Sequence, residues 1–80
     1  MAGAEKLLSE LACGESAEIV KLDGDSAVSR RLMEMSLLPG ERVTVLRTAP
    51  WGDPIMLKLS TSSVAIRRKD AARVFVRSVE

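Results

Sequence analysis

The sequence predicts a mainly β fold: a small five-stranded antiparallel barrel with one or two short helices covering it. Three observations support this prediction. The chain has only 80 residues, its second half alternates apolar and polar side chains with a period of two, and two segments of its first half show a helical period. Strands this short and few can bury a face only if the sheet curls over itself. An open α+β sheet is the alternative. We expect residues 1–80 to form a single domain.

The first quarter of the chain is expected to hold a short helix and then a strand. Over residues 5–11 the leucines are spaced by three and four positions, which predicts an amphipathic helix that closes one end of the barrel. This helix should end near Gly14. Residues 17–22 carry the β-branched Ile19 and Val20 between charged neighbours, and they predict the first strand.

The main helix is predicted over residues 27–35. Its N-cap is Asp25 or Ser26, because either side-chain oxygen can accept a hydrogen bond from an otherwise unpaired backbone N–H. The stripe that faces the core consists of Val28, Leu32 and Met35. A tight turn follows, in which Pro39 fixes φ at the second position and Gly40 accepts a positive φ at the third.

The second half of the chain is predicted to form strands joined by short connections. The strands are expected over residues 42–48, 55–59, 64–66 and 73–79. Residues 49–54 predict a loop, because two prolines and a glycine within six residues cannot continue a strand ladder. A turn is expected at residues 61–63, and a single helical turn at residues 69–72.

Composition excludes several classes of function. Twelve Lys and Arg against eleven Asp and Glu give a net charge of +1, so no strong field attracts nucleic acid. The absence of His, with Cys13 as the one cysteine, argues against a zinc finger, a redox pair and serine–histidine catalysis. No apolar run approaches the roughly 20 residues that span a bilayer, and residues 1–8 lack the features of a signal peptide. We therefore expect a cytoplasmic protein that is not an enzyme, has no cofactor and does not insert into membranes.

Two segments resemble the ferrous iron transport protein A family, FeoA. Residues 30–40 are similar to that family's helix ending in a Leu-x-x-Gly-Leu-x-Pro-Gly pattern. Residues 49–55 are similar to its Ala-Pro-x-Gly-Asp-Pro loop between two strands, and residues 65–71 to its Leu-Arg-x-x-Glu-Ala segment. The resemblance covers nearly the whole chain, from about Leu8 to Val76.

Two positions depart from the family pattern. The glycine that follows the family's helix is Ser36 here, which would cost on the order of 1 kcal/mol if that backbone is left-handed. The glycine usual in the hairpin at residues 61–63 is also missing. Neither departure touches the Pro-Gly turn or the Ala-Pro loop.

The resemblance implies an SH3-like barrel that regulates bacterial-type ferrous iron uptake. Its partner would be a membrane ferrous iron transporter with a cytoplasmic GTP-binding domain, of the FeoB type, on which the chain would dock without catalysis of its own. A similar barrel is the appended last domain of the metal-dependent repressors. No DNA-binding helix-turn-helix precedes it here, which favours a free-standing accessory protein. The small core is also compatible with a weak homodimer, although no residue pattern demands one.

The docking residues are expected on the main helix and on the loop at residues 49–54. The candidate partner-binding residues are Arg30, Arg31, Met33, Pro50, Trp51 and Asp53. The residues that carry the structural motif are Leu32, Pro39, Gly40, Gly52 and Pro54. An exposed Trp framed by two prolines is typical of a binding hot spot, whereas an indole folded over one end of the barrel would only cap the core.

Other polar groups have ordinary structural explanations beside their functional ones. Arg30 with Arg31, and residues 67–69, form two cationic clusters that are either solvated faces or a dock for an acidic or phosphate-rich surface. Arg31 could also contact a nucleotide phosphate. We expect Asp53 to bond its own backbone in a turn and Cys13 to be a half-buried apolar residue rather than a metal ligand.

Two further classes of function compete with docking. A small barrel could bind nucleic acid, but near-zero charge and two aromatic residues argue against base stacking. A metal-sensing or metallochaperone domain, related to that of the repressors, would need ligands that a chain with no His and one Cys hardly supplies.

Overall fold

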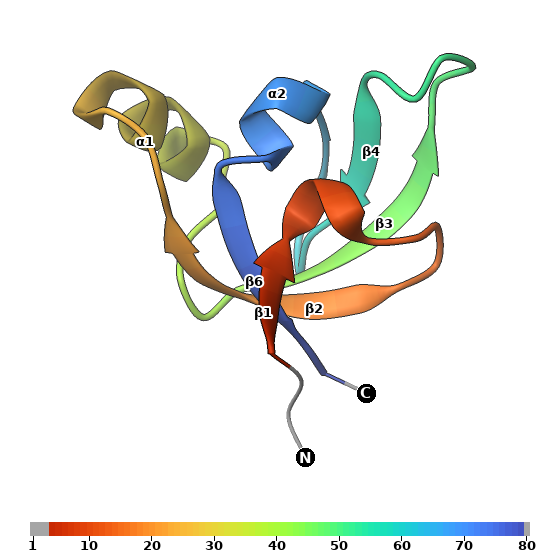
Figure 1. Cartoon of the computed structure of the whole chain (residues 1–80), viewed down its shortest axis with the longest axis horizontal. Coiled ribbons are helices and arrows are strands. Elements are labelled where there is room, and N and C mark those ends of the chain that lie inside the picture. The colour runs from red at the N-terminus through yellow and green to blue at the C-terminus, as the bar shows by residue number, and fades with distance from the viewer. Residues whose placement is uncertain (1–3, 80) are drawn as a thin grey trace.

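The protein is a strongly curved, six-stranded antiparallel sheet with two short helices (Figure 1), described from a computed structural model over residues 4–79. The elements are β1 (Glu5–Leu7), the 3₁₀ helix η1 (Leu8–Glu10), β2 (Ser16–Leu22), α1 (Ser26–Glu34), β3 (Arg42–Thr48), β4 (Ile55–Lys58), β5 (Ser63–Ile66), α2 (Arg68–Ala71) and β6 (Val74–Ser78). The strand order is β1-β6-β2-β3-β4-β5, which leaves β1 and β5 at the two edges. The mainly β fold class is thereby confirmed.

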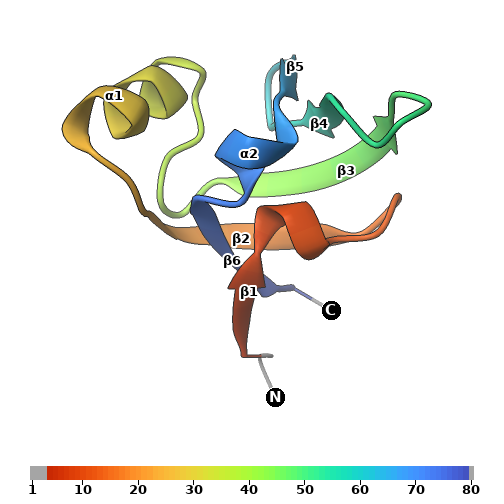
Figure 2. The ribbon, with the colours of Figure 1, turned by 45° about the horizontal axis from the view of Figure 1, so that its top comes forward.

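The sheet curls because two of its inner strands are bulged. The pairing of β2 with β6 shifts register between Ile19 and Lys21, and that of β3 with β4 shifts between Val45 and Arg47. A bulge bends a strand and increases its twist. As a result α1, α2 and the β4–β5 hairpin all lie on one side of β2 and β3 (Figure 2).

The core is aliphatic and comes from the alternating residues of the strands. The largest fully buried side chains are Leu8, Ile19, Leu32, Leu37, Val43, Val45, Ile55, Leu57, Val74 and Val76. The period-two alternation predicted for the second half of the chain is confirmed on β3, β4 and β6, whose buried residues lie two positions apart. On α1, Leu32 is buried while Val28 and Met35 pack partly against the core, as the predicted stripe requires.

The predicted opening helix over residues 5–11 is wrong. Glu5–Leu7 is a strand that pairs with β6, with Leu7 opposite Phe75, and only Leu8–Glu10 is helical, in a 3₁₀ turn. Leu8 and Leu11 are both buried, and a spacing of three places side chains on one side of a 3₁₀ turn. The extra strand raises the count from the expected five to six. It forms because β6 has an open edge that the local leucine spacing does not reveal.

The ends of α1 follow the predicted chemistry. Asp25 is the N-cap, and its Oδ1 accepts a hydrogen bond of 2.9 Å from the backbone N–H of Val28. At the other end Ser36 has a φ of 72°. Its N–H donates to Met33 O at 2.9 Å, and Leu37 N–H donates to Leu32 O at 3.1 Å. These two bonds form a Schellman motif, so the helix ends as the family's glycine would end it, with a serine in the strained position.

Candidate functional site

The first turn of α2 brings the two predicted docking regions together. Arg31 on α1 forms an ion pair of 3.1 Å between its Nη2 and Asp70 Oδ1 on α2. From the other side, the Oδ2 of the loop residue Asp53 lies 3.9 Å from the Nη1 of Arg67. With Lys69 these residues line an open hollow of about 540 Å³, which we call the α2 hollow.

The charges around the α2 hollow leave a positive excess. Three cations (Arg31, Arg67 and Lys69) face two carboxylates, and among the described residues Lys69 takes part in no ion pair. The side chains of Arg31 and Arg67 are 55% and 69% exposed, so their ion pairs are held weakly against solvent. These arginines can exchange their present partners for carboxylates on an incoming surface.

Arg68 ties the loop at residues 49–54 to the rest of the fold. Its backbone N–H donates to Asp53 Oδ1 at 2.9 Å, its Nε to Gly52 O at 2.8 Å and its Nη1 to Ser9 O at 2.9 Å. The sequence interpretation placed Arg68 in a cationic cluster that is either a solvated face or a dock, and it missed this role. No local signal could have found it, because the partners lie 15, 16 and 59 positions away.

Asp53 bonds differently from the prediction. We expected its carboxylate to accept from its own backbone, but its Oδ1 accepts from Arg68 instead, at the start of α2. The loop closes through other groups: Gly52 N–H donates to Ala49 O at 2.7 Å, and Ala49 N–H to Pro54 O at 3.0 Å. Gly52 has a φ of 83°, and the Asp53–Pro54 peptide is cis. The loop is therefore bonded both within itself and to α2.

Trp51 projects from this loop into solvent. Its exposed fraction is 92%, and the neighbouring Pro50 is also exposed. The alternative in which the indole caps one end of the barrel therefore does not hold in this structure. The next residue, Gly52, is held by Arg68, and Asp53 of the same loop lines the α2 hollow.

The remaining predicted residues divide between surface and interior. On α1, Arg30 is exposed and Met33 is 42% exposed, off the core-facing stripe. Leu32 is fully buried. In the turn after α1, Gly40 has a φ of 94° and its N–H donates to Ile19 O at 2.8 Å, so this turn is joined to β2.

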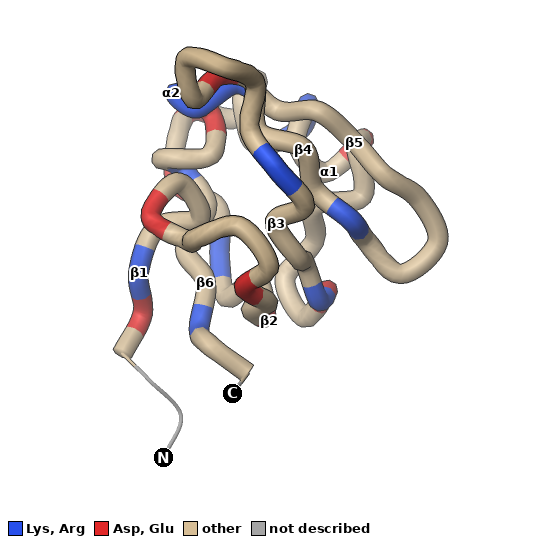
Figure 3. Tube along the Cα trace, turned by 90° about the vertical axis from the view of Figure 1, so that its right-hand side faces the viewer, with Lys and Arg blue, Asp and Glu red and all other residues tan. Residues whose placement is uncertain are grey.

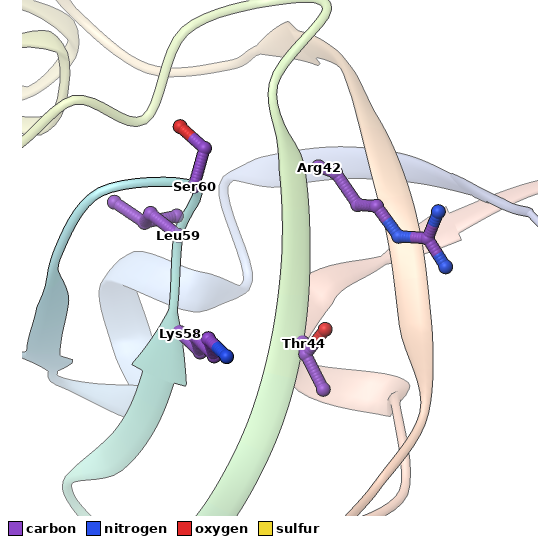
Figure 4. Close-up of a pocket in the computed structure, with 5 residues that line it drawn as sticks. All are labelled: Arg42, Thr44, Lys58, Leu59 and Ser60. Atoms are coloured by element: carbon purple, nitrogen blue, oxygen red, sulfur yellow. The ribbon is translucent and has the colours of Figure 1, made fainter.

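A second, smaller hollow of about 250 Å³ lies on the outer face of β3 and β4. Its lining residues are Arg42, Thr44, Lys58, Leu59 and Ser60. The Arg42 guanidinium points away from the β4 residues, across β2 (Figure 4), so the two cations do not converge on one point. The strands β3 and β4 carry only basic charges, as Figure 3 shows, whereas α2 carries both signs.

Within residues 4–79, no three side chains of His, Cys, Asp or Glu lie close enough to share a metal ion. Cys13 is exposed rather than half-buried as expected, because the turn between η1 and β2 turns it out of the core. None of the described helices is long and apolar enough to cross a bilayer.

Comparison with known proteins identifies the family of this chain. A family described as the FeoA domain matches residues 6–78. The chain is 38% identical over 69 residues to the Fe(2+) transport protein A/Fe(2+) transporter FeoB fusion protein of Porphyromonas gingivalis. The match covers 86% of this chain but only 8% of that fusion protein.

Solved structures agree with this match. A FeoA protein from Chlorobium tepidum has a TM-score of 0.87 and 37% identity, over 94% of this chain and 71% of that one. FeoA from Stenotrophomonas maltophilia, described as an SH3 domain protein and complexed with zinc, has a TM-score of 0.76 and 31% identity, over 89% and 88% of the two chains. The predicted SH3-like character of the fold is thereby confirmed.

Proposed function

Because this chain belongs to the FeoA domain family, we propose that it is a small accessory protein of ferrous iron uptake that docks on the cytoplasmic side of a FeoB-type transporter. The proposed partner is the transporter's GTP-binding domain. The chain would act by binding alone, without catalysis or a cofactor of its own.

The fusion relative supports the choice of partner. In that protein a domain similar to this chain and a FeoB transporter share one polypeptide. Covalent linkage raises the effective concentration of two modules to about the millimolar range, which favours modules that work together. When the two are separate chains, a docking surface must supply the affinity that the linkage would otherwise provide.

The observation that carries the proposed surface is Trp51, which is 92% exposed on the same loop as Asp53, a residue that lines the α2 hollow. A large indole on a fixed loop loses little conformational freedom when it is buried in a partner. The cations Arg31 and Arg67 line the hollow and attract a negative surface. The surface therefore fits a partner that offers an apolar pocket bordered by carboxylates.

Binding to the purified full-length transporter in lipid nanodiscs tests the proposal. Calorimetry should be run without nucleotide, with GDP and with a slowly hydrolysed GTP analogue. We expect saturable binding, weakened by Trp51→Ala by about 2 kcal/mol or more, roughly 30-fold in Kd. Charge reversal at the α2 hollow, Arg67→Glu, should also weaken binding and remove part of its salt dependence.

The matched control is Arg47→Glu, the same charge reversal at an exposed position on β3 outside the α2 hollow. It should change affinity less than Arg67→Glu does. Saturable binding that neither Trp51→Ala nor Arg67→Glu affects would refute the proposed surface. No binding in any nucleotide state would refute the proposed function.

A further inference from the structure

The strand β5 is an open edge of the sheet that carries no charge, proline or bulge. It lies at the end of the strand order opposite β1, and its residues Ser63–Ile66 contain no charge and no proline. Its pairing with β4 is regular, with no bulge. Native edges are commonly protected by charges, prolines or bulges, and the other edge, β1, carries Glu5 and Lys6.

The free hydrogen-bonding groups of β5 can be assigned from its register. Leu59 N–H donates to Ser62 O at 2.7 Å, which marks that pair as hydrogen-bonded. Bonded and non-bonded pairs alternate along an antiparallel ladder, so Val64 and Ile66 face β4 through their pairs with Leu57 and Ile55. The N–H and C=O groups of Ser63 and Ala65 then point away from the sheet.

These outward groups are accessible. Ser63 and Ala65 are both exposed, and within residues 4–79 no other segment hydrogen-bonds to their backbone. Two N–H groups and two C=O groups, spaced as in a strand, therefore face solvent in a row. An extended peptide can pair with such a row by adding a strand.

The C-terminal end of β5 leads directly into the α2 hollow. Arg67 follows Ile66 in the chain and lines that hollow with Arg31 and Lys69. A strand added antiparallel to β5 has its N-terminal end beside Ile66. Residues that precede such a strand would lie against these cations, so carboxylates are favoured there.

We propose that the transporter docks by adding an extended segment antiparallel to β5, and that acidic residues immediately precede this segment and lie at the α2 hollow. This inference rests on the proposed function and names the partner element involved. The backbone of Ser63 and Ala65 binds the segment, while the cations set its direction. A second copy of this chain fits less well, because self-pairing of β5 places the uncharged Thr61 and Ser62 near Arg67.

Amide hydrogen exchange with residue resolution tests the pairing directly. In the free protein, the amides of Ser63 and Ala65 should exchange fast while those of Val64 and Ile66 are slowed by their bonds to β4. Exchange is then repeated in the complex with the full-length transporter in nanodiscs and read after dissociation. We expect the Ser63 and Ala65 amides to slow at least tenfold on binding.

The matched variants are Ala65→Pro and Ala65→Ser. Proline removes the outward N–H but leaves the bonds to β4, since proline is tolerated at an edge where the N–H faces solvent. Ala65→Pro should bind the transporter at least tenfold more weakly than Ala65→Ser, which keeps the N–H. Unchanged protection at Val64 and Ile66 in Ala65→Pro shows that β5 remains folded, and the exchange data on the native chain do not depend on this variant.

The outcomes separate the two proposals. Binding that leaves the Ser63 and Ala65 amides unprotected and Ala65→Pro unimpaired overturns strand addition and leaves the proposed function standing. Protection that grows with the concentration of this chain alone identifies a second copy as the occupant and overturns the inference. No binding to the transporter overturns both.

Discussion

Replacing Ser36 with glycine should stabilise this protein. Ser36 follows the last turn of α1 with a φ of 72°, a left-handed conformation in which a Cβ crowds the backbone. Its N–H and that of Leu37 close the helix by hydrogen bonds to Met33 O and Leu32 O. Glycine keeps both bonds, because both come from the backbone, and it removes the Cβ. The side chain of Ser36 is exposed, so no buried contact is lost.

The size of the gain follows from two opposing effects. A left-handed residue with a Cβ costs roughly 1–2 kcal/mol. Replacing Ser36 with glycine removes this cost. Glycine also raises the conformational entropy of the unfolded chain, which lowers the free energy of unfolding by about 0.4–1 kcal/mol. The net increase in the free energy of unfolding should be about 0.5–1 kcal/mol. For a domain of this size that corresponds to about 2–8 °C in Tm.

Urea denaturation followed by circular dichroism measures this difference. With a slope of about 1 kcal/mol per molar urea, the midpoint of Ser36→Gly should rise by about 0.5–1 M. Ser29→Gly is the matched control: the same change within α1, where the backbone is right-handed and Ser29 N–H bonds to Asp25 O at 3.0 Å. It should lower stability by about 0.5 kcal/mol. If Ser36→Gly lowers stability as Ser29→Gly does, the strain assigned to Ser36 is absent.

Three other changes have definite expected outcomes. Leu57→Ala removes a fully buried side chain and should cost about 2–5 kcal/mol in urea denaturation, with Leu57→Met costing less than about 1.5. Asp25→Ala removes the N-cap of α1 and should cost about 1 kcal/mol, whereas Asp25→Asn, which can still cap, should cost little. The backbone N–H of Ala12 and the ammonium of Lys6 hold the pKa of Glu15 below its ordinary value of 4.5. The ionised Glu15 therefore stabilises the protein above about pH 4.5, and this stabilisation is lost as the pH falls through the folded-state pKa of Glu15. In Glu15→Gln, the free energy of unfolding should decline less over this pH range. Equal acid sensitivity of the two proteins would contradict that contribution.

Two of the wrong predictions, the opening helix and the turn bond of Asp53, share one cause. The spacing of Leu7, Leu8 and Leu11 fits a helix, yet Glu5–Leu7 is extended because it pairs with β6, some 70 positions later in the chain. Asp53 has the composition of a local turn, yet it bonds to Arg68. In both cases the hydrogen bonds are made with a partner distant in sequence rather than with a neighbouring residue. A local pattern holds no information about that partner.

The sequence by itself determined the features that depend on neighbouring residues. The two-residue period set the buried faces of β3 and β4, Asp25 set the start of α1, and Pro39 with Gly40 set the turn after it. Each follows from local sterics and hydrogen bonding, which act over a few residues.

Only the tertiary structure decided which surface residues meet. It joined Arg31 to α2 through Asp70, used Arg68 to hold the loop that carries Trp51, and left β5 as an open edge. The sequence shows these residues as separate charges and a short apolar run. Their placement depends on how the bulged sheet closes, and that depends on long-range pairing rather than on local pattern.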